Sequence, residues 1–176
     1  MSTVAQTKDA AGTAYRRMAI ALLALCGLLI AIYLSMYRLG MIGALVCGPT
    51  GPGCEIVQLS PWSSIAGVPV PCIGIVAYTI ILVVALLGTS GRLAESRGVR
   101  NTLFGMGCCA FAFAAYNMSV EAFVIHAFCV WCATCAACAV GIFALSLPER
   151  PGRRGRPSME SAGGSALDGP PIPAAS

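Results

Sequence analysis

Charged residues are scarce in this sequence. Only 10% of its 176 residues are Asp, Glu, Lys or Arg, and 57% are hydrophobic, whereas soluble domains carry about 25% charged residues. This scarcity excludes an ordinary soluble domain. The few basic residues lie beside apolar segments and do not gather into the patch that nucleic-acid binding requires. The composition therefore predicts an integral membrane protein that contacts lipid and binds no nucleic acid.

Four segments are apolar and long enough to cross a membrane as helices, which takes about 20 residues each. We expect these spans at residues 18–37, 68–88, 101–120 and 127–147. The predicted fold class is an all-α integral membrane protein, a bundle of four transmembrane helices within one domain, residues 15–147. The flanking stretches, residues 1–14 and 148–176, have too few apolar residues to form a core, and we expect both to be disordered.

The loops between these segments differ in charge. Basic residues precede the first segment, separate the second from the third and follow the fourth, whereas residues 39–67 and 119–126 contain no Lys or Arg. By the positive-inside rule, both termini are cytoplasmic and these two loops face outward. The longer loop predicts a short interfacial helix whose apolar face is formed by Ile56, Val57, Leu59, Trp62 and Ile65. Ser60 can cap a turn there or donate a hydrogen bond to a ligand.

Four of the ten cysteines recur at every third residue, at positions 129, 132, 135 and 138. Three residues of an α-helix advance about 300°, so Cys129 and Cys138 point to opposite faces, about 13 Å apart along the axis. One metal ion cannot bind all four, and we predict no metal site. Cys135, Cys138 and the cysteines at positions 26, 72, 108 and 109 are expected to pack as small buried residues.

Two cysteine pairs on the outer side are candidates for redox chemistry. Cys129 and Cys132 form a Cys-x-x-Cys motif at the predicted start of the fourth helix, where the helix N-terminus lowers a thiol pKa. Cys47 and Cys54 flank the sequence GPTGPG, which can turn tightly and bring the two sulfurs together. The loop pair is either a fixed structural disulfide or a mobile one that exchanges with other thiols.

The order of these motifs is specific. The loop pair comes first, then SPWSSIAGVPV, then Gly74-x3-Tyr78, and Cys-Val-Trp-Cys comes last. In this order the chain resembles the bacterial branch of the vitamin K epoxide reductase family over about residues 15–147. The disulfide bond formation protein B family also has four spans and two pairs, but its Cys-x-x-Cys comes early.

The resemblance implies a multi-pass protein of a bacterial plasma membrane, with a thiol–disulfide relay on the outer side. A separate, reduced thioredoxin-like protein attacks a Cys47–Cys54 disulfide, and Cys47 takes the mixed disulfide. Cys54 then attacks Cys129, and Cys132 passes two electrons to a quinone, either menaquinone or ubiquinone. A pocket inside the bundle is expected to hold the apolar quinone.

Several polar or aromatic residues lie near this expected site. We expect Ser60, Trp131 and Asn117 to contact the quinone together with Cys132. An amide inside the membrane is costly unless it is paired, which favours a pocket position for Asn117. His126 and Glu121 are interpreted as residues of the membrane boundary.

Two departures from the family pattern bear on the substrate. Vertebrate members have an Asn four residues before the second-span Gly and a Tyr four residues after the second cysteine of Cys-x-x-Cys, where this chain has Val70 and Ala136. Ordinary quinone reduction is therefore expected rather than epoxide reduction. The alternatives are an enzyme that reduces a quinone or its epoxide for quinone recycling, and a non-enzymatic membrane scaffold with structural cysteines.

Overall fold

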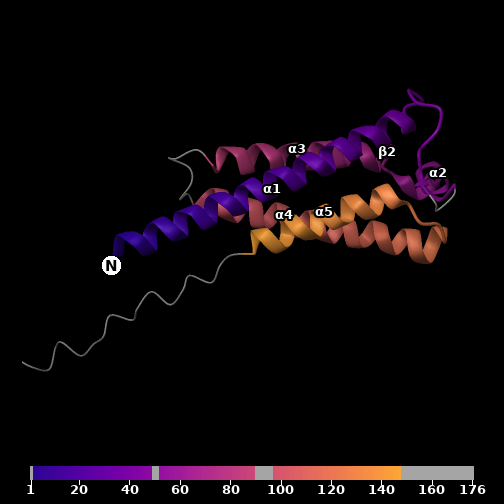
Figure 1. Cartoon of the computed structure of the whole chain (residues 1–176). Coiled ribbons are helices and arrows are strands. Elements are labelled where there is room, and N and C mark those ends of the chain that lie inside the picture. The colour runs from indigo at the N-terminus through magenta and orange to yellow at the C-terminus, as the bar shows by residue number, and fades with distance from the viewer. Residues whose placement is uncertain (1, 49–51, 90–96, 148–176) are drawn as a thin grey trace, which may run out of the picture.

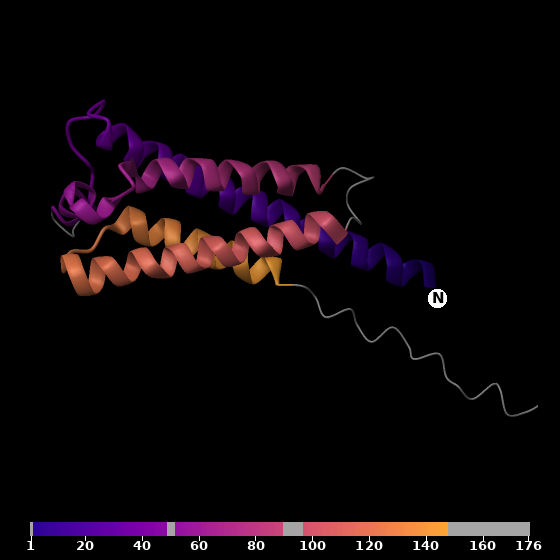
Figure 2. The ribbon, with the colours of Figure 1, turned by 180° about the vertical axis from the view of Figure 1, so that it is seen from behind.

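A computed structural model describes residues 2–48, 52–89 and 97–147. Four long helices lie side by side, and short elements cover one end of the bundle, opposite the N-terminus (Figures 1 and 2). The long helices are α1 (Ser2–Arg38), α3 (Val70–Leu87), α4 (Arg97–Val120) and α5 (Val130–Ser146). The covering elements are α2 (Gly53–Leu59), the 3-10 turn η2 (Pro61–Ser63), and strands β1 (Ser64–Ile65) and β2 (Val68–Pro69). A π-helical turn, η3 (Glu121–Ile125), extends α4.

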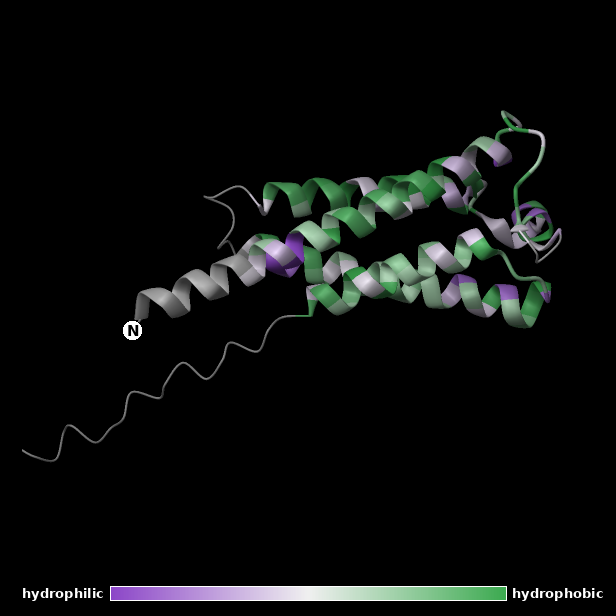
Figure 3. Ribbon diagram, viewed as in Figure 1, coloured by the Kyte–Doolittle hydropathy of each residue, from purple (hydrophilic) through white to green (hydrophobic). Residues whose placement is uncertain are grey.

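Hydrophobic residues predominate along α3, α4, α5 and the part of α1 that is coloured by hydropathy (Figure 3). Within the described ranges, three helices are long and apolar enough to cross a membrane: Gly12–Arg38, Val70–Leu87 and Gly98–Ile125. Helix α5 is also apolar but has only 17 residues. The mostly helical fold with apolar helices is thereby confirmed, and the count of four spans and the interfacial position of the short loop helix stay predictions.

The helices pack through small residues. Helix α1 contacts α3 and α5, and α4 packs against α5 and α3. A Cβ atom added to Gly27 would lie 2.5 Å from ring carbons of Tyr78, so α1 and α3 approach this closely only because position 27 is glycine. The Tyr78 hydroxyl donates a hydrogen bond of 2.8 Å to the Cys135 carbonyl. Tyr78 therefore ties α3 to α5 in the middle of the bundle.

At the end of the bundle opposite α2, an arginine caps α5. The Arg16 Nη2 atom donates hydrogen bonds of 2.7 Å to the Leu145 carbonyl and 2.9 Å to the Leu147 carbonyl. A cation at a helix C-terminus satisfies carbonyls that have no partner inside the helix. This contact fixes the position of the C-terminal end of α5 along α1.

The structure corrects several element boundaries. Helix α1 begins at Ser2, so the stretch expected to be disordered, residues 1–14, is helical from its second residue. This stretch contains several alanines and no proline, and extending an existing helix costs far less than starting one. Helix α3 begins at Val70 because residues 68–69 pair with residues 64–65 as an antiparallel ribbon. The predicted tail, residues 148–176, lies outside the described residues.

Candidate functional site

The four candidate cysteines meet where α2 covers the bundle. The Cys54 thiol, fully buried in α2, contacts the thiols of Cys47 and Cys129. Cys129 in turn contacts Cys132. The sulfurs therefore form a continuous series in the order Cys47, Cys54, Cys129, Cys132, with every neighbour within hydrogen-bonding reach.

A glycine allows α2 to lie this close to α5. A Cβ atom added to Gly53 would lie 2.5 Å from the Phe128 carbonyl oxygen, in the residue that precedes Cys129. The Cys54 sulfur also interacts with the backbone N–H of Val130, at the start of α5. The sequence order Gly53–Cys54 thus places the second loop cysteine directly against the Cys-x-x-Cys motif.

The two central thiols differ in acidity. Cys129 is the N-cap of α5, and its sulfur accepts a hydrogen bond of 3.4 Å from the Cys132 backbone N–H. Hydrogen bonding from the Cys132 thiol lowers the pKa of Cys129 to about 7, and the same N–H and the Cys54 thiol add to this effect. Burial and the nearby Glu121 carboxylate act in the opposite direction and only partly offset it. Burial, followed by hydrogen bonding to Cys47, raises the pKa of Cys54 to about 12. The helix end therefore favours the thiolate at Cys129.

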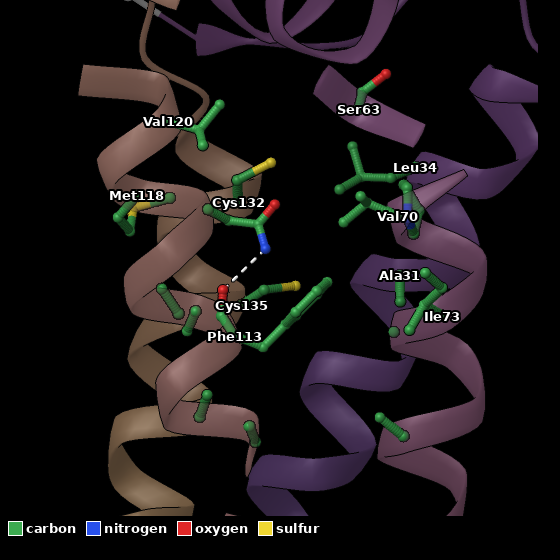
Figure 4. A pocket seen from close by; sticks show the side chains of 18 of the residues that line it. Ala31, Leu34, Ser63, Val70, Ile73, Phe113, Met118, Val120, Cys132 and Cys135 are labelled. Atoms are coloured by element: carbon green, nitrogen blue, oxygen red, sulfur yellow. Dashed lines mark hydrogen bonds between the residues drawn. The ribbon is translucent and has the colours of Figure 1, made fainter. Parts of the chain in front are cut away.

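An apolar cavity of about 350 Å³ begins where the sulfur series ends. It lies between the four long helices, and Cys132 and Cys135 line it from α5. Across the cavity, Leu34 of α1 and Val70 of α3 face these two thiols (Figure 4). Cys132 therefore connects the buried sulfur series to a space of the size that small-molecule ligands occupy.

Residues 18–147 match the Vitamin K epoxide reductase family. The chain belongs to this family. The resemblance drawn from the order of the motifs is thereby confirmed, and membership in the family supports an oxidoreductase activity in a membrane.

Glu121 is the site residue whose position differs most from the expectation drawn from the sequence. It was interpreted as a boundary residue, yet only 3% of it is exposed, and it lines the cavity. Its Oε2 atom accepts a hydrogen bond of 3.0 Å from the Cys129 backbone N–H, and its carboxylate hydrogen-bonds to the Cys132 thiol. The helical backbone continues as η3 past Glu121 to Ile125, so the expected connection at residues 119–126 is almost entirely helical. Its end is at His126, which has a left-handed φ of 55°.

Gln58 is a cavity residue that the sequence argument did not single out. It is 2% exposed, and its Nε2 atom lies 3.8 Å from the Cys132 sulfur. The Ser63 hydroxyl donates a hydrogen bond of 2.6 Å to the Gln58 carbonyl, which holds this end of α2 in place. The Gln58 Oε1 atom has no hydrogen-bond partner within the described part of the chain. A lone Gln between apolar residues gives no sequence signal for such a position.

Of the three other residues expected to contact a quinone, one lines the cavity. Asn117 does, and its Nδ2 atom donates to the Phe113 carbonyl at 2.9 Å. The Ser60 hydroxyl instead accepts a hydrogen bond of 3.3 Å from the Trp62 N–H and caps η2. Neither Ser60 nor Trp131 is among the residues that line the cavity.

Trp131 holds the first loop beside the cysteines. Its Nε1 atom donates a hydrogen bond of 2.8 Å to the Val46 carbonyl, one residue before Cys47. The ring meets Tyr33 edge-on at a centroid distance of 5.2 Å, and the Tyr33 hydroxyl accepts a hydrogen bond from the Val46 N–H at 3.1 Å. In this position the indole holds the first loop, and the quinone contact expected of Trp131 stays a prediction.

Proposed function

We propose that this chain is a membrane thiol:quinone oxidoreductase that supports disulfide bond formation. In this function it reoxidises a separate, extracytoplasmic thioredoxin-like protein and passes the electrons to a quinone, menaquinone or ubiquinone. One observation carries the proposal: four thiols are in contact in the order of the relay, and the last of them lines an apolar cavity.

The first exchange takes place at the loop pair. A thiolate of the reduced partner attacks a Cys47–Cys54 disulfide at Cys47 and releases Cys54. The partner's second thiol then resolves the mixed disulfide, so the partner is oxidised and the loop pair is reduced. Cys47 suits the outer role because it is 7% exposed and follows the exposed Val46, whereas Cys54 is fully buried against Cys129.

The second exchange transfers the electrons inward. The Cys54 thiolate attacks Cys129 of a Cys129–Cys132 disulfide and releases Cys132. Cys47 then attacks Cys54, which restores the loop disulfide and releases Cys129. A thiol of lower pKa is the better leaving group, so a pKa of about 7 at Cys129 favours this release.

The cavity suits a quinone. Its volume of about 350 Å³ lies within the range of small-molecule sites, and most of its lining is apolar. The unpartnered Gln58 oxygen and the Asn117 amide offer polar contacts within it. A bound quinone would supply the capacity to accept two electrons and two protons. Gln58 and Asn117 would orient it, and Cys132 would lie against it.

Two lining residues favour ordinary quinone reduction over epoxide reduction. Val70 and Ala136 occupy the positions where vertebrate family members have Asn and Tyr, and both line the cavity. Neither side chain can donate a hydrogen bond to an oxygen of the substrate.

The proposed setting is a bacterial plasma membrane with four spans, both termini in the cytoplasm and the cysteine end outside. Arg16 and Arg17 support this orientation, because they bond to the C-terminal ends of α5 and α3. Those two helix ends lie away from α2 (Figure 1). The loop that carries Cys47 and Cys54 has no basic residue between positions 39 and 67.

The proposal is tested with purified protein in detergent, a soluble quinone and a reduced thioredoxin-like protein. Quinone absorbance is followed for the wild type and for Cys129→Ser. We expect quinone loss that requires the partner, the protein and Cys129, and Cys47→Ser should abolish the partner-driven reaction. Absence of reduction with several quinones and thiol donors, for a folded protein, would show instead that the cysteines are structural.

A further inference from the structure

Glu121 is the one carboxyl group among the described residues that lines the cavity. Its carboxylate hydrogen-bonds to both cysteines of the motif, through the Cys129 backbone N–H and the Cys132 thiol. Such a position in an apolar membrane bundle is costly for a charged group. Membrane proteins keep buried carboxyls mainly where a function, often proton transfer, requires them.

The backbone explains how a residue expected at the boundary reaches the cavity. Glu121 is the first residue of the π-helical turn η3, which interrupts the α-helical register before the chain reaches Cys129. π-helical turns are rare and frequently occur at functional sites. The left-handed His126 then ends the turn, and the Cys129 N–H points back at the Glu121 carboxylate.

We propose that Glu121 carries a proton between the Cys132 thiol and the ligand of the cavity. This inference rests on the proposed function and adds to it a residue that moves protons. When the Cys129–Cys132 disulfide forms, the dithiol loses two electrons and two protons, and a quinone takes up two of each. The Cys132 proton passes to the Glu121 carboxylate and from there to a quinone oxygen. The Cys129 proton is released to the medium when that thiol ionises, and the medium returns one proton to the quinone.

The position of Glu121 fits this role on both sides. It touches the sulfur that gives up the proton, and it lines the space in which a quinone oxygen would receive it. Gln58 also lies against Cys132, at 3.8 Å, but an amide does not titrate and cannot carry a proton in this way. The Asn117 side chain is also an amide and cannot carry a proton either.

The test isolates the second cysteine pair in the full-length chain. In a Cys47→Ser/Cys54→Ser background, the reduced protein is mixed with a soluble quinone, and a single turnover is followed by quinone absorbance. Glu121→Gln preserves size and can still accept the Cys129 N–H hydrogen bond. We expect it to slow this turnover by about 100-fold or more, which is typical for the loss of a proton-transferring group. Glu121→Asp, which still titrates, should restore the rate to within about tenfold of the wild type.

The matched control is Glu55→Gln. Glu55 accepts a hydrogen bond of 3.3 Å from the Leu45 N–H in the first loop and does not line the cavity. The quinone step should be unchanged in this variant. In chains that keep the loop pair, Glu121→Gln should form the mixed disulfide with the partner at the wild-type rate, which also shows that the variant folds.

A second readout does not require quinone. The alkylation rate of the Cys129 and Cys132 thiols is measured as a function of pH in the same background. These thiols are the titratable groups that interact with Glu121 from α5 and its N-cap. Helix α2, which also packs against η3, brings Cys54 toward Cys129 in the native chain. Glu121→Gln should remove one ionisation from the profile, and Glu55→Gln should not.

The outcomes are separable. A wild-type turnover rate in Glu121→Gln would overturn the proposal. An unchanged alkylation profile in this variant would overturn it too, because Glu121 would then only position the thiols. If the wild type reduces no quinone at all, the proposed function fails. The alkylation profile then decides alone whether Glu121 exchanges protons with the thiol pair.

Discussion

Substituting Gly53 by alanine tests whether contact between Cys54 and Cys129 carries the relay. The added Cβ atom would lie 2.5 Å from the Phe128 carbonyl oxygen. That oxygen belongs to the backbone, so α2 must move away by several tenths of an ångström, at a cost of about 1–3 kcal/mol for an overpacked contact. A misplacement of about 1 Å between reacting groups lowers rates about 100-fold. We therefore expect partner-driven quinone reduction to fall by about 10- to 100-fold in Gly53→Ala.

The assay separates the two exchanges. Reduction of the loop disulfide by the partner, measured in a Cys129→Ala background, should be nearly unchanged in Gly53→Ala because Cys47 is not displaced. Gly43→Ala is the matched control, since a Cβ atom at Gly43 meets nothing within 4 Å. If Gly53→Ala retained the wild-type rate of partner-driven quinone reduction, the close packing of α2 on α5 would not be needed for the transfer, and the argument would be wrong.

Three further predictions concern acidity, packing and the first loop. The alkylation rate of Cys129 should rise with pH with a midpoint near 7, because only the thiolate reacts. Cys132→Ala should raise this midpoint, because it removes the thiol that hydrogen-bonds to Cys129. Cys132→Ser keeps a hydrogen-bonding group and should largely preserve the midpoint. Gly27→Ala should lower the free energy of unfolding in detergent by about 1–3 kcal/mol, seen as a lower unfolding temperature, because its Cβ atom would lie 2.5 Å from the Tyr78 ring. Gly105→Ala should leave the unfolding temperature unchanged, because its Cβ atom would meet open space. Trp131→Phe should slow exchange with the partner, because it loses the hydrogen bond to the Val46 carbonyl, and should leave the KM for quinone unchanged; a raised KM would restore the indole as a quinone contact.

The sequence was informative wherever chemistry depends on spacing or on long apolar runs. The order of the two cysteine pairs predicted which sulfurs lie together, and all four are in contact. The apolar segments predicted four spanning helices, and three helices within the described ranges are long and apolar enough to span a membrane. Asn117 was placed at the cavity because an intramembrane amide needs a partner, and it does line the cavity.

The misplaced residues depend on local register and on tertiary partners. Glu121 directly follows the third predicted span, residues 101–120, but a π-helical turn continues the backbone past it. A shift of one residue rotates a helical side chain by about 100°, so periodicity cannot show which way Glu121 points. The indole of Trp131 suits lipid or ligand equally well, and its hydrogen bond to the Val46 carbonyl could not be foreseen from the sequence. Helix α1 extends to Ser2 because a polar, alanine-containing stretch can propagate a helix as well as remain disordered.

The capped ends of α5 have a consequence for depth in the bilayer. Its 17 residues rise about 26 Å, whereas the hydrocarbon core of a typical bilayer is about 30 Å thick. Arg16 holds the inner end near the cytoplasmic headgroups in the proposed topology, so the outer end, with Cys129, lies a few ångströms below the opposite headgroups. This hydrophobic mismatch places the dithiol within reach of a lipid-dissolved quinone ring. In the proposed relay, electrons thus reach the quinone within the hydrocarbon layer, and the quinone does not have to enter water.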